Sequence, residues 1–385
     1  MSVTSPTQLA DGQLVHEALA VPSEQEAVRQ NEIWALKRKV AEQLARELRE
    51  YYETDVVERF QREHGRAPAD RHEIAAVMSN DPRMQMFSAL RRRSQEQMWD
   101  LVLSSVERQR DRLLDVADQA SSAPGSLELN PSLEIPRYLT VVDIHCMPTG
   151  YYREYIPDDV TAGALYDRGV YIYAGGQLGG WNDDKGWSVI RGYLDQHCPD
   201  WEPATILDMG CSVGHSTIPY TQRYPRAEVH AIDVAAPMLR YARARAAAFG
   251  APIHFSQRDA TATGYPDGSF DLVVSHIMLH ETSTKAVQQV LDESYRLLRP
   301  GGLMIHAEFP SFDVMDPFTQ FLIDWDTTNN NEPFWSKVRT LDLVSMAVQA
   351  GFDPANVSRE FVPTGRRLTT GKGGGGQMQL LVGRR

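Results

Sequence analysis

The sequence predicts an α/β protein in which a doubly wound parallel sheet fills the C-terminal half and a helical region precedes it. From about residue 204 onward, short β-branched runs alternate with helical patterns, which is typical of a parallel sheet. Over the first 120 residues, apolar side chains recur instead at helical spacing. The 385 residues are enough for two or three domains.

Composition and charge narrow the class of protein. Apolar residues make up 42% and charged residues 23%, an ordinary globular mixture. The net charge of −12 repels nucleic acid and anionic membrane surfaces, so we expect neither as a partner. The three cysteines show no paired spacing, and neither a signal peptide nor an apolar membrane span is recognisable. A cytoplasmic location is therefore expected.

Residues 1–120 are expected to form a helical N-terminal region. Ser23 and Glu26 have the spacing of a capping box, and an apolar stripe begins at Ile33. A second long helix is predicted from about Pro82 to Ala117. Its methionines and aromatic residues are more typical of a core than of a ligand site. Alternatively, this helical region could cover a pocket or form the interface of a homodimer.

Residues 121–190 are expected to form a linker and an aromatic segment. The first part, 121–137, is rich in Ser and Pro, and Tyr138 to Ile144 reads as a strand. Residues 145–190 are rich in glycine and aromatic side chains. Residues 191–385 then form the α/β domain, with a lid insertion expected near 311–340.

The first strand of this domain leads into a glycine-containing turn. Thr205 to Met209 reads as a buried strand, Gly210 to Gly214 as the turn, and a helix is predicted to begin near Ser216. Such a turn lets a ligand approach backbone amides, and the helix N-terminus favours a carboxylate. Plain tight packing also produces glycines between a strand and a helix.

An acidic residue ends the second predicted strand, about twenty residues further on. The carboxylate of Asp233 could accept hydrogen bonds from both ribose hydroxyls of a nucleoside. A helix begins nearby at Pro237, so Asp233 could also cap that helix. Further strands are predicted at residues 252–255, 270–276 and 303–306.

Together, LDMGCSVG, the acid ending the second strand, RDA, FDLVVS and LLRPGG resemble the class I S-adenosylmethionine-dependent methyltransferases. This broad group includes the ubiquinone-biosynthesis C-methyltransferases. The resemblance covers roughly residues 200–310 and, more loosely, 311–385. It implies a Rossmann-like methyltransferase sheet, S-adenosylmethionine as the cofactor, and methyl transfer as the activity. A nicotinamide-binding fold would show G-x-G-x-x-G, whereas the glycines here read G-x-x-x-G.

The resemblance also implies roles for individual residues. Asp208 and the turn from Gly210 to Gly214 would lie under the methionine part, Asp233 would bind the ribose, and Asp259 the adenine. The full set of expected cofactor-binding residues is Asp208, Gly210, Cys211, Ser212, Gly214, Asp233, Val234, Met238, Asp259, Ala260 and Ser275. Ser212 replaces a glycine that is common in the family. A serine is acceptable there if its φ angle is negative.

The candidates for catalysis lie at the end of the fourth strand and just after it: His280 and Glu281 come first, and His276 is the third. Methyl transfer is an in-line displacement, so the protein must align the acceptor, and a hydroxyl or ammonium acceptor also needs a base. His280 could instead pack on the loop, and Glu281 could cap a helix. His276 and His280 have the spacing of two metal ligands, but no third ligand is evident, so no metal is expected.

The expected acceptor site is aromatic. Tyrosines offer flat faces and hydroxyl groups to a small molecule, although they could equally pack the seam between domains. The candidates are His145, Tyr151, Tyr152, Tyr155 and Trp325. A small metabolite is the leading acceptor. A protein methyltransferase and a cofactor-binding scaffold without activity are the alternatives. Gly371 to Gly376 is expected to link two strands of a hairpin.

Overall fold

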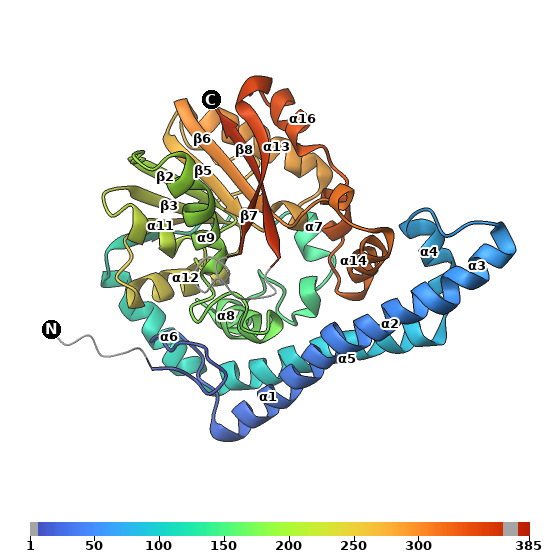
Figure 1. Ribbon diagram of the computed structural model, residues 1–385. Helices are drawn as coiled ribbons and strands as arrows, with labels where there is room; N and C mark the ends of the chain where they lie inside the picture. The colour runs from blue at the N-terminus through green and yellow to red at the C-terminus, as the bar shows by residue number, and fades with distance from the viewer. Residues whose placement is uncertain (1–6, 365–375) are drawn as a thin grey trace.

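The computed structural model describes residues 7–364 and 376–385, which form a sheet domain and a long helical arm beneath it (Figure 1). Eight strands make one sheet in the order β1-β4-β3-β2-β5-β6-β8-β7. The first six are parallel to their neighbours, and β8 and β7 are antiparallel. The strands are β1 (Gly125–Glu128), β2 (Thr205–Met209), β3 (Glu228–Asp233), β4 (Ile253–Gln257), β5 (Phe270–His276), β6 (Leu298–Glu308), β7 (Val357–Pro363) and β8 (Gln377–Arg384).

Helices cover both faces of the sheet, as the prediction of a doubly wound domain requires. One core cluster joins the sheet to the helices around Val189, Ile218 and Leu239, and another joins it to those around Val290 and Leu343. The helices of the domain are α9 (Asp184–Val189), α10 (Asp195–His197), α11 (Ile218–Arg223), α12 (Ala236–Ala248), α13 (Thr284–Leu297), α15 (Trp335–Val338) and α16 (Leu343–Gln349). The predicted α/β fold class is confirmed.

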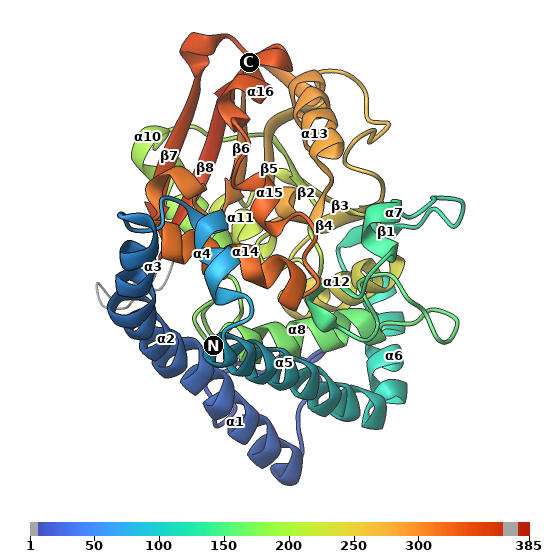
Figure 2. The ribbon, with the colours of Figure 1, turned by 90° about the vertical axis from the view of Figure 1, so that its right-hand side faces the viewer.

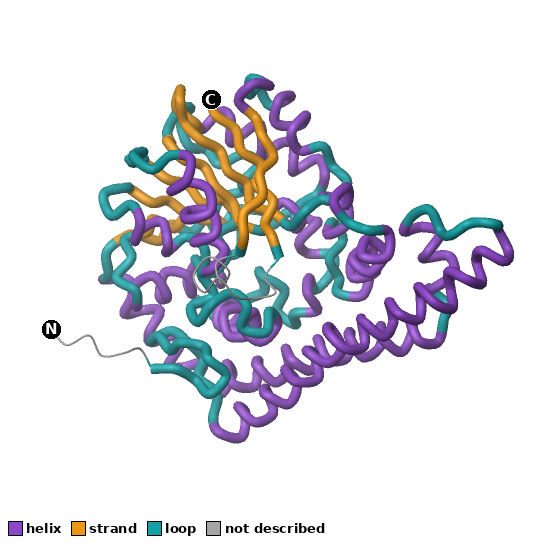
Figure 3. Tube along the Cα trace, viewed as in Figure 1, coloured by secondary structure: helices purple, strands orange, loops and turns teal. Residues whose placement is uncertain are grey.

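The helical arm comprises residues 24–108 and is the long purple pair of rods in Figure 3. The Ser23–Glu26 capping box is present at its start. Two π-helical turns, Lys39–Leu44 and Tyr52–Val56, interrupt the first rod without ending it. The arm consists of α1 (Glu24–Arg38), α2 (Ala45–Tyr51), α3 (Val57–His64), α4 (Arg71–Met78) and α5 (Pro82–Arg108).

Two packing contacts between the arm and the rest of the protein are the most extensive. Helix α5 packs along α8 (Thr161–Tyr173), and α4 packs against α14 (Pro317–Asn329), as Figure 2 shows. The second contact buries Phe318 and Phe321 against apolar side chains of the arm. The segment near 311–340 therefore rests on the arm. Its movement as a lid stays a prediction.

Three expected elements differ from the structure. The predicted strand from Tyr138 to Ile144 is wrong, because this stretch forms a short helix, α7 (Arg137–Thr140), and a 3₁₀ turn, Ile144–Cys146. Within the expected linker, β1 adds a parallel edge strand beside β4. The second long helix ends at Arg108, and α6 (Arg110–Gln119) follows.

At the end of the chain, β7 and β8 pair as the expected hairpin strands, whereas residues 371–375 of the glycine run lie outside the described residues. In the described ranges, no helix is both long and apolar enough to cross a membrane.

Candidate active site

A cavity of about 830 Å³ lies at the carboxyl ends of the parallel strands and reaches the inner side of the helical arm. Strand order reverses between β2 and its two neighbours, β3 and β5, which is where ligands bind in such sheets. The volume falls within the range of small-molecule sites. The sequence-predicted residues that line it are His145, Tyr151, Tyr152, Asp208, Gly210, Cys211, Ser212, Asp233, Val234, Met238, Asp259, Ala260, His276, His280 and Glu281.

Asp233, at the end of β3, is held in place by the backbone. Its Oδ2 accepts a hydrogen bond from the Ser212 amide at 2.9 Å, and its Oδ1 accepts one from the Ala235 amide at 3.0 Å. Burial raises its pKa, although these amides favour the charged form. No arginine or lysine pairs with Asp233 in the described residues, so a ligand donor would meet a fixed, unneutralised carboxylate.

The turn after β2 has room for no side chain at Gly210, because Met278 lies against the backbone there. Gly210 has φ +69°, and a Cβ there would lie 2.3 Å from Cγ of Met278. Ser212 also has a positive φ, of 51°, so the negative φ on which an acceptable serine depended is not present. The left-handed conformation of Ser212 accompanies the hydrogen bond from its amide to Asp233.

Asp208, at the end of β2, and His276, at the end of β5, are partners. Asp208 Oδ2 accepts a hydrogen bond from Thr217 Oγ1 at 2.6 Å, and His276 Nδ1 lies 3.4 Å from Asp208 Oδ1. The other ring nitrogen of His276 lies 3.1 Å from the Tyr220 hydroxyl. Both ring nitrogens of His276 therefore have partners, which favours a positioning role over that of a free base.

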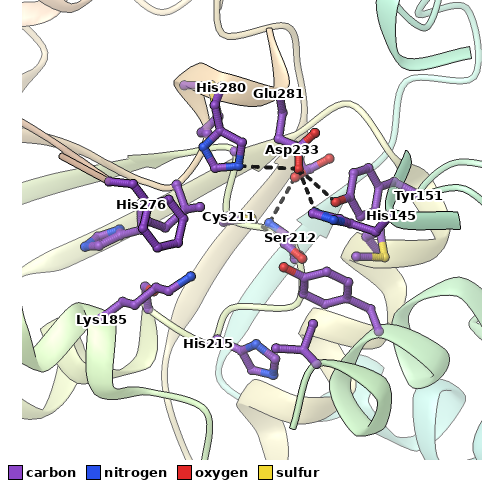
Figure 4. Close-up of a pocket in the computed structure, with 18 of the residues that line it drawn as sticks. His145, Tyr151, Lys185, Cys211, Ser212, His215, Asp233, His276, His280 and Glu281 are labelled. Carbon is purple, nitrogen blue, oxygen red and sulfur yellow. Dashed lines mark hydrogen bonds and ion pairs between the residues drawn. The ribbon is translucent and has the colours of Figure 1, made fainter. Parts of the chain in front are cut away.

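The opposite part of the cavity is organised around Glu281. Its Oε1 accepts a hydrogen bond from the Tyr151 hydroxyl at 3.0 Å and lies 3.1 Å from His145 Nε2 (Figure 4). His280 Nε2 lies 3.8 Å from the same oxygen. Oε2 of Glu281 has no hydrogen-bond partner among residues 7–364 and 376–385, so it is available to a bound molecule.

His145 is clamped between two carboxylates. Its Nε2 faces Glu281, and its Nδ1 lies 3.1 Å from Oε1 of Glu332. Burial opposes the charge, but the two carboxylates outweigh it and raise the pKa of His145 to about 10. His145 is therefore an imidazolium at neutral pH.

The backbone of His145 is strained and is held by the helical arm. Its φ is +56°, a left-handed value that costs a non-glycine residue about 1–2 kcal/mol. Its carbonyl accepts hydrogen bonds from Trp99 Nε1 at 2.7 Å and Gln95 Nε2 at 3.0 Å, both on α5. The arm thus fixes a side chain of the site.

His280 is also paired with an acid. Its Nδ1 lies 2.8 Å from Oε2 of Glu308, whose other oxygen accepts the Leu279 amide at 2.7 Å. Burial opposes protonation, yet Glu308 raises the pKa of His280 above its usual value. The contact with Glu308 occupies Nδ1 and favours the protonated form of His280, which fits a neutral base less well. Glu281 fits that role, or that of an anchor, better.

Residues 206–302 match a family described as "Methyltransferase domain". This stretch carries β2 to β5 and therefore the strand ends described above. It forms a methyltransferase domain. The match confirms the predicted methyltransferase class for this part of the chain.

Similar proteins share this part of the chain. A demethylmenaquinone methyltransferase of Thermus thermophilus is 39% identical over 108 residues, which are 28% of this chain and 48% of that protein. A malonyl-[acyl-carrier protein] O-methyltransferase of Halorhodospira halophila is 36% identical over 107 residues, 28% of this chain and 35% of that protein. The chain thus matches half or less of the length of each of these two relatives.

One solved structure with a similar arrangement is phosphoethanolamine N-methyltransferase 2 of Haemonchus contortus. It is 14% identical, with a TM-score of 0.41, over 57% of this chain and 58% of that one.

Four predicted site residues lie elsewhere. Gly214 (φ +76°) lies in the turn but does not line the cavity, and the Ser275 hydroxyl is buried against His306 Nδ1 at 2.7 Å. Tyr155 was expected in the acceptor wall but is 61% exposed. Trp325 donates its indole hydrogen to Ser88 on α5 at 3.0 Å and lines a separate cavity of about 510 Å³.

Sequence reasoning missed four side chains of the site: Tyr138, Lys185, Glu308 and Glu332. Three of them line the cavity, and Glu308 holds His280. Tyr138 lines the same cavity as Asp259 and Asp233, and burial, together with these two acids, raises its pKa. Only Glu308 carried a usable signal, because it follows the strand predicted at residues 303–306 by two positions.

Proposed function

We propose that this protein transfers a methyl group from S-adenosylmethionine to a small molecule bound in the cavity. One observation carries the proposal: the acids at the strand ends and the Glu281 cluster line one continuous cavity. A donor held at the strand ends would therefore share an enclosed space with its acceptor. The methyltransferase names of the relatives support transfer of a methyl group, and their acceptors differ.

The residues at the strand ends fit the cofactor. Asp233 offers carboxylate oxygens that amide hydrogens already orient, which suits two adjacent ribose hydroxyls. Gly210 keeps the turn free of side chains. Asp259 accepts hydrogen bonds from Thr261 through Oδ1 alone, which leaves Oδ2 for the adenine amino group.

The bound cofactor supplies a methyl group on a positively charged sulfur, and the electron pair of the broken bond stays on that sulfur. The protein has to align the acceptor and exclude water. Glu281, fixed by Tyr151 and His145, would hold a hydroxyl or amine of the acceptor at Oε2 and take its proton where one must leave. The positively charged imidazolium of His145, 3.1 Å from Oε1, holds Glu281 in this position.

Calorimetry with S-adenosylhomocysteine tests the cofactor part. Asp233→Asn should weaken binding at least about tenfold, because hydrogen bonds to a charged group contribute about 1.5–3 kcal/mol. Glu228→Gln, at the exposed opposite end of β3, is the matched control and should bind as the wild type. Unchanged affinity in Asp233→Asn would refute the ribose assignment.

Methyl transfer itself is tested with isotopically labelled cofactor and two sets of acceptors, a metabolite extract and a protein fraction. The proposal predicts a labelled small molecule, at a rate that falls about a hundredfold or more in Glu281→Gln. Label in protein alone would favour a protein methyltransferase. Cofactor binding without any labelled product would favour a scaffold.

A further inference from the structure

Among the described residues, Lys185 is a cation of the cavity wall without an acidic ion-pair partner. It lies on α9, and in Figure 4 its side chain extends into the cavity from the side opposite Tyr151 and His145. Its Nζ lies 5.4 Å from the centre of the Phe309 ring. Within the described part of the chain, no carboxylate lies close enough to Nζ for an ion pair.

The other basic side chains of the cavity wall differ in this respect, because each has an acidic partner. The pairs are His145 with Glu281 and Glu332, His215 with Asp167, Arg258 with Glu128, and His276 with Asp208; His280 pairs with Glu308. Lys185 is thus the one basic group of this wall, in the described residues, whose charge is left to a ligand.

Burial without a partner is unfavourable for an ammonium group. It lowers the pKa of Lys185 to about 8, although the more distant carboxylates of Glu308, Glu281 and Glu332 act in the opposite direction. The side chain therefore still carries its charge at neutral pH. A negatively charged ligand that hydrogen-bonds to Nζ would remove much of the penalty.

We propose that Lys185 binds an anionic oxygen of the methyl acceptor, so that the acceptor is a small molecule bearing a carboxylate or a phenolate. This inference rests on the proposed function. A negatively charged acceptor would be attracted both to the ammonium of Lys185 and to the sulfonium of the donor. The Phe309 ring beside Lys185 offers an apolar face to the remainder of the molecule.

Protection of lysines from acetylation tests this proposal in the full chain saturated with S-adenosylhomocysteine. The protein is treated with acetic anhydride at pH 8, and each lysine is quantified by peptide mass spectrometry. Benzoate and 4-nitrophenolate should slow acetylation of Lys185 about fivefold or more, and neutral benzamide should not. Exposed Lys285 and half-buried Lys37, which does not line the cavity, are the reference lysines.

Calorimetry of benzoate binding gives a second readout that does not depend on reactivity. Lys185→Met should weaken binding about tenfold or more, and Lys185→Arg, which keeps the charge, should stay within about threefold of the wild type. Protection by benzoate alone would assign a carboxylate, and protection by 4-nitrophenolate alone a phenolate. Absence of protection by both anions, or equal benzoate affinity in Lys185→Met, overturns the proposal.

Failure of this inference and failure of the proposed function look different. A protein that does not bind S-adenosylhomocysteine contradicts the function. A protein that binds it, yet acetylates Lys185 equally with benzoate and benzamide, contradicts the role of Lys185 alone.

Discussion

The helical arm should help to set the pKa of His145, because Trp99 and Gln95 of α5 hold the backbone of this residue. Trp99→Phe removes the 2.7 Å hydrogen bond to the His145 carbonyl while keeping an aromatic ring against Gly169. Leaving a buried carbonyl short of a donor costs about 1–3 kcal/mol. Because the left-handed backbone of His145 is itself unfavourable, loss of this bond should let the residue leave the conformation in which its side chain faces the two carboxylates. The remaining bond from Gln95 limits the change, so the double variant Trp99→Phe/Gln95→Leu should show it fully.

The pKa of His145 reports this change without any knowledge of the acceptor. One pKa unit corresponds to about 1.36 kcal/mol. If the protonated form of His145 between Glu281 and Glu332 loses that much stabilisation, the pKa of His145 falls by up to about one unit. NMR titration of the imidazole measures it. Trp34→Phe, on the same arm but without an indole hydrogen bond in the described residues, is the control. An unchanged pKa of His145 in the double variant would refute positioning by the arm.

Two further predictions concern stability. Gly210→Ala should lower the free energy of unfolding by about 1–2 kcal/mol, because its φ is +69° and the new Cβ would meet Met278; urea denaturation measures this, and wild-type stability would contradict the close approach. His145 retains its proton in the folded state up to about pH 10, whereas the unfolded chain loses it near pH 6.5. The stabilisation by this group is therefore complete below pH 6.5 and is lost as the pH rises towards 10, so His145→Gln should flatten the decline in stability between those values. An equally steep decline in the variant would count against the double clamp.

The cofactor end of the site could be predicted because its geometry follows from chain order. Asp208, Asp233 and Asp259 each follow a strand of one parallel sheet, and parallel strands bring their carboxyl ends to the same edge. The resemblance added the roles. Their use by a cofactor remains a prediction that the structure makes geometrically reasonable.

The acceptor end could be predicted only in part, because contacts between distant segments decide it. Nothing local indicates that His145 takes a left-handed conformation held by α5 or faces Glu332. An aromatic residue near the site in sequence can also point away from it, as Tyr155 does. Lys185 could not be singled out from the sequence, because only the fold shows that it faces the cavity without an ion-pair partner among the described residues.

The expected strand from Tyr138 to Ile144 failed for a related reason. Its β-branched and aromatic residues suit a strand, but the sheet edge beside β4 is already occupied by β1. Contacts with the rest of the fold thus decided between a strand and the short helix and turn that this stretch forms.

A crystal structure of the protein with S-adenosylhomocysteine tests the central claim most directly. We predict ribose hydroxyls within hydrogen-bonding distance of the Asp233 carboxylate, adenine beside Asp259, and the sulfur facing the part of the cavity that holds Glu281. A ligand bound at another place, or one whose ribose points away from Asp233, would contradict the account.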